Sequence, residues 1–169
     1  MKSATILTDE FYLKCISLAT QSKGNERYGS IIVVDEKIIG EGYNRAIAHP
    51  SFGRLEREIR QGMANHAEVE AMNDALANGL QIEGSELYVA GFFPKSGQLF
   101  FKKDYTCVKC IPHMRNYGIT NIYDPTPDGW LKKSLEVAGE EAKKFTNGTH
   151  QKRIDAIIGD FFITDLNIS

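Results

Sequence analysis

The sequence predicts a three-layer α/β/α domain built around a mixed β-sheet. The order of the expected elements supports this fold class: one helix, two strands of a hairpin, and then helices and strands in alternation. The length supports it too, because 169 residues are enough for one buried core, and no internal repeat, low-complexity segment or linker divides them. We therefore expect a single domain over residues 1–169.

The first expected element is a helix over residues 8–22. Thr8 can cap this helix, and apolar residues recur behind the cap at helical spacing. Cys15 lies on this apolar stripe, so we interpret it as a small buried hydrophobic residue and not as a metal ligand.

A β-hairpin is expected next. Its strands cover residues 30–34 and 37–43, and a tight turn at residues 35–36 joins them. Gly40 and Gly42 alternate with bulkier residues in the second strand. Glycine at such positions permits the close approach of another backbone segment or of a ligand, or it marks a bulge.

The middle of the chain alternates between helix and strand. A helix is expected to begin near His66 and to end at Gly79, and residues 85–92 have the composition of a buried central strand. Residues 45–64 are irregular and rich in arginine, which favours a solvated mixed-charge surface over an anion-binding lid. Residues 93–105 predict a longer loop or a small hairpin.

Two more helices and a strand are expected after the loop. One helix begins at Cys107, where Thr106 can serve as its cap, and Pro112 kinks it unless the first turn is separate. A short strand over residues 119–123 and a loop follow. Apolar residues then recur at helical spacing over residues 131–145, which predicts a long helix.

The last segment, residues 148–169, contains isoleucine and phenylalanine at helical spacing. We expect this segment to form a helical extension that packs on the domain or on a partner subunit.

Composition limits the classes of function. The net charge of -2 provides no basic field that would attract nucleic acid or an anionic membrane. Three cysteines are too few for a disulfide scaffold, and we see no signal peptide, so we expect a cytoplasmic protein. The apolar runs are too short to span a membrane.

Four residues in two segments predict a catalytic zinc site. His66, Cys107 and Cys110 carry side chains that zinc prefers, and the two cysteines are close enough in sequence for both sulfur atoms to reach one ion. Three protein ligands leave an open position in which zinc activates water. Glu68 lies two residues after His66 and can take a proton from that water and return it to a leaving nitrogen. We expect one zinc ion per chain.

A closed structural zinc site is the alternative for the cysteine pair. It requires a fourth protein ligand, for which His113 is the best placed because it lies three residues after Cys110. His49 and His150 are less constrained. Glu68 separates the two hypotheses, because a zinc-stabilised binding module does not need it.

The segment His66-Ala67-Glu68, followed by Cys107-Val108-Lys109-Cys110, resembles the zinc-dependent cytidine/deoxycytidylate deaminase superfamily. Gly42-Tyr43-Asn44 also resembles the strand end of deoxycytidylate and tRNA-adenosine deaminases, and the chain is similar to guanine deaminases as well. The resemblance covers about residues 11–123, most of the chain.

By this resemblance the fold is cytidine-deaminase-like, with a mixed five-stranded sheet, and the reaction is the hydrolytic deamination of an aminated pyrimidine or purine ring. The zinc ligands are then His66, Cys107 and Cys110, and Glu68 is the proton shuttle. The resemblance also implies a homodimer or a higher homo-oligomer. The residues expected to contact the substrate are Asn44, Arg45, Ala67 and Thr106.

The chain departs from the family pattern in three places. Thr106 stands where the family usually has proline, and a capping threonine can do the same structural job. The loop before Cys107 is longer than usual by residues 94–105, and Pro112-His113 is atypical after the second cysteine. The last two departures lie beside the expected pocket, so they weaken any transfer of substrate specificity.

Three classes of substrate compete. A free cytosine nucleoside or nucleotide, such as CMP or dCMP, ranks first, because the arginines of residues 45–60 and Lys102-Lys103 can hold a phosphate. Adenosine in tRNA is suggested by residues 39–44, but the acidic balance argues against a nucleic-acid partner. An amino-purine such as guanine, or a specialised metabolite, is the third. Outside the enzymes, a non-catalytic zinc-stabilised module is the alternative.

Overall fold

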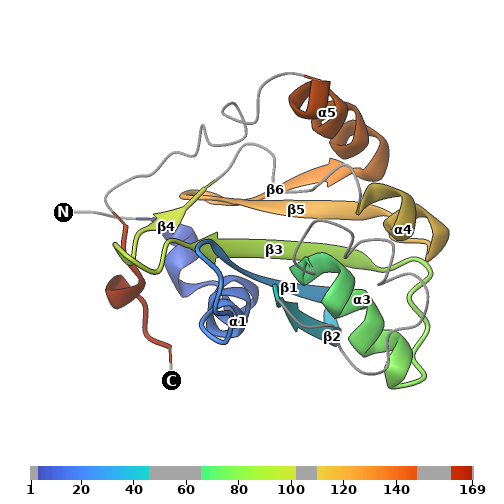
Figure 1. The fold of residues 1–169 in the computed structure, drawn as a ribbon. Helices are drawn as coiled ribbons and strands as arrows, with labels where there is room; N and C mark the ends of the chain where they lie inside the picture. Colours follow the sequence, from blue (N-terminus) through green and yellow to red (C-terminus); the bar gives the residue numbers. More distant parts are fainter. Residues whose placement is uncertain (1–3, 46–65, 102–109, 148–160, 169) are drawn as a thin grey trace.

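The computed structural model describes residues 4–45, 66–101, 110–147 and 161–168, which form a mixed sheet between two layers of helices (Figure 1). Five strands lie in the order β2-β1-β3-β5-β6, and the short strand β4 pairs with β3 off this path. β3 and β5 are parallel, and the other strand pairs among these residues are antiparallel. The predicted α/β class with a mixed five-stranded sheet is confirmed. The strands are β1 (Arg27–Val34), β2 (Lys37–Tyr43), β3 (Glu86–Phe92), β4 (Leu99–Phe100), β5 (Asn121–Thr126) and β6 (Gly129–Ser134).

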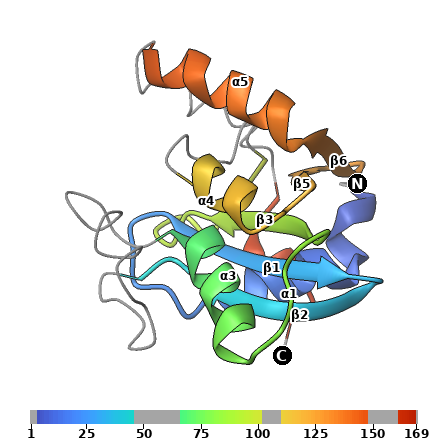
Figure 2. The ribbon, with the colours of Figure 1, turned by 90° about the vertical axis from the view of Figure 1, so that its right-hand side faces the viewer.

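The helices divide between the two faces of the sheet (Figure 2). Helix α1 (Glu10–Ala19) and the 3-10 turn Thr5–Thr8 pack on one face. Helices α3 (Ala67–Ala77), α4 (Ile111–Asn116) and α5 (Leu135–Asn147) pack on the other. The domain therefore has two apolar cores, one in the layer of α3, α4 and α5 and one in the layer of α1.

Alternate residues of the central strands supply the two cores. In β1, Ile32 packs in the layer of α3, α4 and α5, whereas Ile31 and Val33 pack in the layer of α1. In β3, Leu87 and Val89 face the layer of α3, α4 and α5, whereas Tyr88 and Ala90 face the layer of α1. Strands buried on both faces explain why the sequence of β1 is a continuous apolar run.

The hairpin of β1 and β2 brings α3 close to the sheet. Asp35 and Glu36 form its two-residue turn with positive φ angles of 49° and 64°, as the sequence predicts. A Cβ atom on Gly40 would lie 2.3 Å from the carbonyl oxygen of Ala71, and one on Gly42 would lie 2.4 Å from the backbone nitrogen of Ala71. Of the alternatives for these glycines, the close approach of a backbone segment is therefore confirmed, and that segment is α3.

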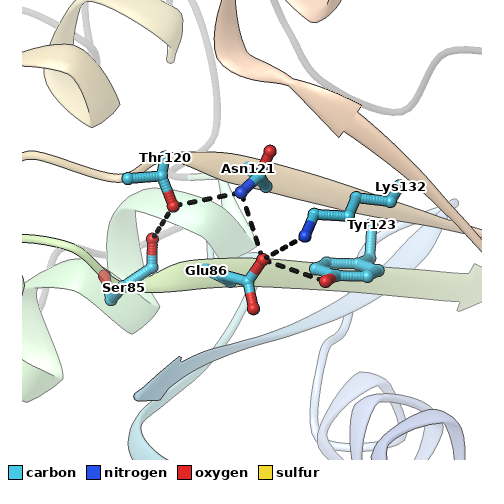
Figure 3. A network of polar contacts seen from close by, with 6 residues as sticks. All are labelled: Ser85, Glu86, Thr120, Asn121, Tyr123 and Lys132. Carbon is cyan, nitrogen blue, oxygen red and sulfur yellow. Dashed lines mark hydrogen bonds and ion pairs between the residues drawn. The ribbon is translucent and has the colours of Figure 1, made fainter. Parts of the chain in front are cut away.

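Polar contacts on the face of the sheet that carries α1 hold the neighbouring strands β3, β5 and β6 in register (Figure 3). One carboxylate oxygen of Glu86 accepts hydrogen bonds from the Tyr123 hydroxyl at 2.9 Å and the Asn121 amide at 3.2 Å. The ammonium group of Lys132 lies 3.4 Å from the same oxygen. These contacts join Glu86 to residues of the two strands beyond it, so they help to hold β3, β5 and β6 together.

The cap of α1 corrects the sequence prediction. Asp9, not Thr8, is the N-cap, and its carboxylate accepts a hydrogen bond from the backbone N–H of Tyr12 at 2.9 Å. Thr8 ends the preceding 3-10 turn, and its hydroxyl donates to the carbonyl oxygen of Thr5. The helix ends at Ala19 because Ser22 and the residues before it turn the chain toward β1.

Strand β6 also corrects the prediction, which placed residues 131–145 in one helix. Thr126 pairs with Gly129 across a two-residue turn, and the chain returns along β5 as far as Ser134. Leu131 is 47% exposed and Lys133 is buried, the reverse of the predicted apolar stripe. The helix keeps only the later part of that stripe, and α5 begins at Leu135.

The start of α4 differs from its predicted position at Cys107. Cys110 is the N-cap, and the helix runs from Ile111 with Pro112 in its first turn, where a missing N–H group costs nothing. Residues 102–109, with the predicted cap Thr106, lie outside the described part of the chain. Because Pro112 lies in the first turn of α4, the kink expected at this residue is not needed.

Residues 161–168 pack on the layer of α1. Gln98 and Phe162 form an antiparallel bridge, and the N–H of Leu99 donates to the carbonyl oxygen of Phe161 at 2.8 Å. The rest of the predicted helical extension, residues 148–160, lies outside the described residues. No helix within the described ranges has the length and apolar character needed to cross a membrane.

Candidate active site

The two helices that carry the predicted site begin at the same edge of the sheet. α3 leads into β3, and α4 leads into β5, which is the parallel neighbour of β3. Each helix returns the chain to the amino end of its strand, so both helices start near the carboxyl ends, where open α/β sheets bind ligands. His66 and Cys110 meet there although they are 44 positions apart in the sequence.

His66 and Glu68 are fixed by the first turn of α3. His66 is the N-cap, with an extended backbone (φ -75°, ψ 148°), and its carbonyl oxygen accepts the backbone N–H of Glu70 at 3.1 Å. Its imidazole makes no capping hydrogen bond. Glu68 is 4% exposed, and the positive end of the helix dipole favours its negative charge.

Cys110 is fully buried at the start of α4, with its sulfur atom 3.2 Å from Nδ1 of His66. One ligand atom each from His66, Glu68 and Cys110 lies within 4.8 Å of the others, so the three residues could hold a metal ion. Tetrahedral zinc with ordinary bond lengths would place its sulfur and nitrogen ligands about 3.5 Å apart, close to the observed separation. The donor set therefore fits zinc.

The other residues of the predicted metal site are placed unequally. Cys107 lies outside the described residues, as does Thr106. His113, the fourth ligand of the alternative closed site, lies in α4 but does not belong to the metal-binding group found among the described residues. Ala67 is 1% exposed, and its carbonyl oxygen lies against Gly42.

Asn44 closes the end of the β1–β2 hairpin. Its side-chain oxygen accepts the backbone N–H of Tyr28 at 2.9 Å, and its amide nitrogen donates to the carbonyl oxygen of Glu26 at 2.8 Å. These bonds give Asn44 a structural role at the end of the hairpin, and they hold its side chain in a fixed orientation. Contact between Asn44 and a substrate remains a prediction.

Arg45 follows at the end of β2, beside α3. Its guanidinium group lies 3.9 Å from a carboxylate oxygen of Glu70 and 5.6 Å from the ring centre of Tyr43. Glu70 is 4% exposed, and it is not among the residues that the sequence predicts for the site. No signal in the sequence distinguishes it, because its burial depends on the segments that pack over the start of α3.

A histidine, a cysteine and a carboxylate gathered at two helix starts of an α/β domain are the arrangement expected of a zinc-dependent hydrolase. The family model of the cytidine and deoxycytidylate deaminase zinc-binding region matches residues 7–124. The chain belongs to this family, as its motifs predict. It is therefore a hydrolase acting on carbon–nitrogen bonds, with zinc as the family's metal.

Several solved structures are similar to this chain. The cytidine deaminase from Burkholderia pseudomallei is 19% identical, with 72% of this chain and 87% of that chain covered and a TM-score of 0.51. The apo dCMP deaminase from the cyanophage S-TIM5 is 20% identical over 72% and 82% of the two chains, with a TM-score of 0.45. The first of these supports the fold assignment. No curated protein gives a significant sequence match.

A third structure is a two-activity enzyme. The diaminohydroxyphosphoribosylaminopyrimidine deaminase/5-amino-6-(5-phosphoribosylamino)uracil reductase from Thermotoga maritima is 24% identical, with a TM-score of 0.45. The match covers 83% of this chain but 34% of that chain, so this chain corresponds to about one third of the larger protein.

Proposed function

We propose that this protein deaminates the cytosine ring of a free nucleoside or nucleotide, releasing ammonia. The observation that carries the proposal is the gathering of ligand atoms from His66, Glu68 and Cys110 within 4.8 Å, in a chain of the cytidine and deoxycytidylate deaminase family. The net charge of -2 favours a small substrate over a nucleic acid.

We propose His66, Cys107 and Cys110 as the three zinc ligands. Zinc held in this way, with one position open, supplies the Lewis acidity that activates water for attack on carbon. The burial of Cys110 and the position of His66 at the N-cap fix two of the ligands on separate helices before the metal binds. Such preorganisation lowers the cost of forming the site.

Glu68 is assigned to proton transfer. Hydrolysis adds the oxygen of water to the ring carbon that bears the amino group and a proton to the adjacent ring nitrogen. A second proton passes to the amino group, the carbon–nitrogen bond breaks, and ammonia leaves a ring carbonyl behind. A carboxylate beside the attacked carbon can carry both protons, and Glu68 lies beside the ligand atoms of His66 and Cys110.

The Glu68 assignment is tested by replacing it with alanine. We expect the variant to retain one zinc ion per chain and the wild-type melting temperature, and to lose ammonia release by a factor of roughly 10² or more. Substrates are screened first as bases, nucleosides and nucleotides of cytosine, adenine and guanine. Full activity of Glu68→Ala would refute the shuttle role, and a best substrate containing a purine would refute the cytosine assignment.

Arg45 is proposed to contact the phosphate of a nucleotide substrate. Glu70 and Tyr43 hold its guanidinium group at the end of β2, beside the start of α3. A single charge-assisted contact predicts a preference for the monophosphate over the nucleoside of roughly 10- to 100-fold in kcat/KM, which Arg45→Ala should remove. Equal kcat/KM values for the two substrates in the wild type would refute this role.

A further inference from the structure

A buried lysine joins three elements: β5, β6 and α5. Lys133 in β6 is 8% exposed, and its ammonium group lies 3.0 Å from a carboxylate oxygen of Asp124 in β5. It lies 2.6 Å from a carboxylate oxygen of Glu141 in α5. Asp124 is 2% exposed, so this ion pair is almost completely removed from water.

The charge of Lys133 is maintained in this environment. Burial alone would lower its pKa, but the negative charges of Asp124 and Glu141 outweigh burial, so the pKa of Lys133 is raised above 10.5. Removing one partner from a buried ion pair leaves an uncompensated charge, which strongly destabilises the packing around it. The three side chains therefore act as one joint between β5, β6 and α5.

This joint supports the helix that carries Cys110. Leu135 and Ala138 of α5 pack in the same core as Cys110 and Ile111. A Cβ atom on Gly139 would lie 3.4 Å from a methyl group of Ile111, so the two helices are in van der Waals contact at the first turn of α4. A shift of α5 away from the sheet would remove this contact and leave the residue that follows the cysteine without support from α5.

We propose that Lys133 is a positioning residue for the metal site: with Asp124 and Glu141 it holds α5 against α4 and so fixes the sulfur atom of Cys110 opposite His66. The inference rests on the proposed zinc site. It assigns a role in metal retention to three residues that lie outside the ligand set.

The test measures how fast zinc leaves the folded protein. Zinc-loaded wild type and Lys133→Met are mixed with excess chelator at 25 °C, and the release of zinc and the circular dichroism of the fold are followed together. We expect Lys133→Met to release zinc roughly tenfold faster than the wild type while it stays folded, as loss of an outer support of a metal ligand typically does. Glu141→Gln keeps the ion pair of Lys133 with Asp124, so its rate of zinc release should increase by a smaller factor. This second variant tests the inference even if Lys133→Met does not fold.

Two control variants separate positioning from general stability. Lys132→Met removes the neighbouring lysine, whose side chain is 57% exposed, and should leave the rate of zinc release unchanged. Ile16→Ala truncates a fully buried side chain in the layer of α1, so it should lower the melting temperature without changing zinc release.

The outcomes distinguish this inference from the proposed function. If wild type binds zinc and Lys133→Met and Glu141→Gln both release it at the wild-type rate, the positioning role is wrong and the zinc site stands. If Ile16→Ala accelerates release as much as Lys133→Met does, the effect is general destabilisation, and the inference is again wrong. A wild type that binds no zinc would instead overturn the proposed function.

Discussion

Two tyrosine hydroxyls in this protein have opposite surroundings. Tyr12 is completely buried in the layer of α1, and its hydroxyl has no hydrogen-bond partner among the residues that the structure describes. Tyr123 donates its hydroxyl to the carboxylate of Glu86 at 2.9 Å (Figure 3). Burying a hydroxyl without a partner costs free energy, whereas a hydrogen bond to a carboxylate is stabilising. The same chemical change should therefore have opposite effects at the two positions.

Replacing Tyr12 with phenylalanine should stabilise the protein. Removal of the unpaired hydroxyl keeps the ring that packs against Phe101 and Trp130, so we expect a gain of about 1 kcal/mol in the free energy of unfolding. The melting temperature should rise by about 2–4 °C, measured by differential scanning calorimetry.

Tyr123→Phe is the matched control and should lower the free energy of unfolding by about 1 kcal/mol, because Glu86 loses a donor. A decrease in stability for Tyr12→Phe, equal to that of the control, would show that the Tyr12 hydroxyl has a partner in solution.

Sequence reasoning worked best for residues whose chemistry is rare. Residue type and spacing were enough to select His66, Glu68 and Cys110, because this pattern of side chains is specific for a catalytic metal site. Glu70 and Lys133 could not, because a buried charge has the same letter in the sequence as an exposed one. Their burial depends on which segments pack over them, and that is a property of the tertiary structure.

At the scale of elements, the contact between β2 and α3 is set by glycine. Gly42 allows the backbone of α3 to approach so closely that any side chain would overlap it, and α3 carries both His66 and Glu68. The carboxylate of Asp74 then accepts the backbone N–H of Glu41 at 2.9 Å, which anchors the second half of the helix to the edge strand. The position of the site relative to the sheet therefore depends on this interface.

Gly42→Ala should displace the start of α3. Its Cβ atom would lie 2.4 Å from the nitrogen of Ala71 and 2.7 Å from the carbonyl oxygen of Ala67, and backbone atoms cannot rotate away as a side chain can. We expect a loss of about 1–3 kcal/mol in the free energy of unfolding and zinc content well below one per chain, measured by urea denaturation and metal analysis.

Glu41→Ala provides the control for this prediction, because Glu41 lies between the two glycines and forms a surface ion pair with Lys14. Exposed ion pairs contribute little, so its stability and zinc content should match those of the wild type. Wild-type zinc content in Gly42→Ala would contradict the role assigned to this interface.

The elements themselves were predictable in proportion to how local their signals are. The β1–β2 hairpin followed from a two-residue turn between apolar runs, and the end of α3 from Gly79, which adopts φ +72°. Strand β6 was missed because Leu131 happens to continue a helical stripe, while pairing with β5 is a long-range contact that the spacing does not record. The sequence of this segment fits both a helix and a strand, and its pairing with β5 makes it a strand.

At the scale of the whole molecule, the two layers have different tasks. The layer of α3, α4 and α5 contains the site and the buried ion pairs of Lys133. The layer of α1 contains aromatic rings and ionisable groups kept neutral by burial. Burial raises the pKa of Cys15 and, aided by Cys15, that of Tyr12, while burial and then Tyr123 raise the pKa of Tyr88. The loss of stability at high pH should therefore begin in the layer of α1, because the raised pKa of Lys133 affects stability only above its ordinary value of 10.5.

Stability should remain constant up to about pH 9 and fall above it. In the unfolded chain these groups lose their protons near the ordinary values of 9.0 for the Cys15 thiol and 10.0 for the tyrosines, whereas in the folded chain they keep them to higher pH. A raised folded pKa thus gives stability that is fully present below the unfolded pKa and is lost as pH rises toward the folded value. Melting temperatures measured from pH 7.5 to 11 should show this fall, and Tyr12→Phe should show a shallower one because one of the groups is gone. A melting temperature that stayed level to pH 11 would mean that these groups titrate alike in the folded and unfolded protein. The conclusion that burial keeps them neutral in the layer of α1 would then be wrong.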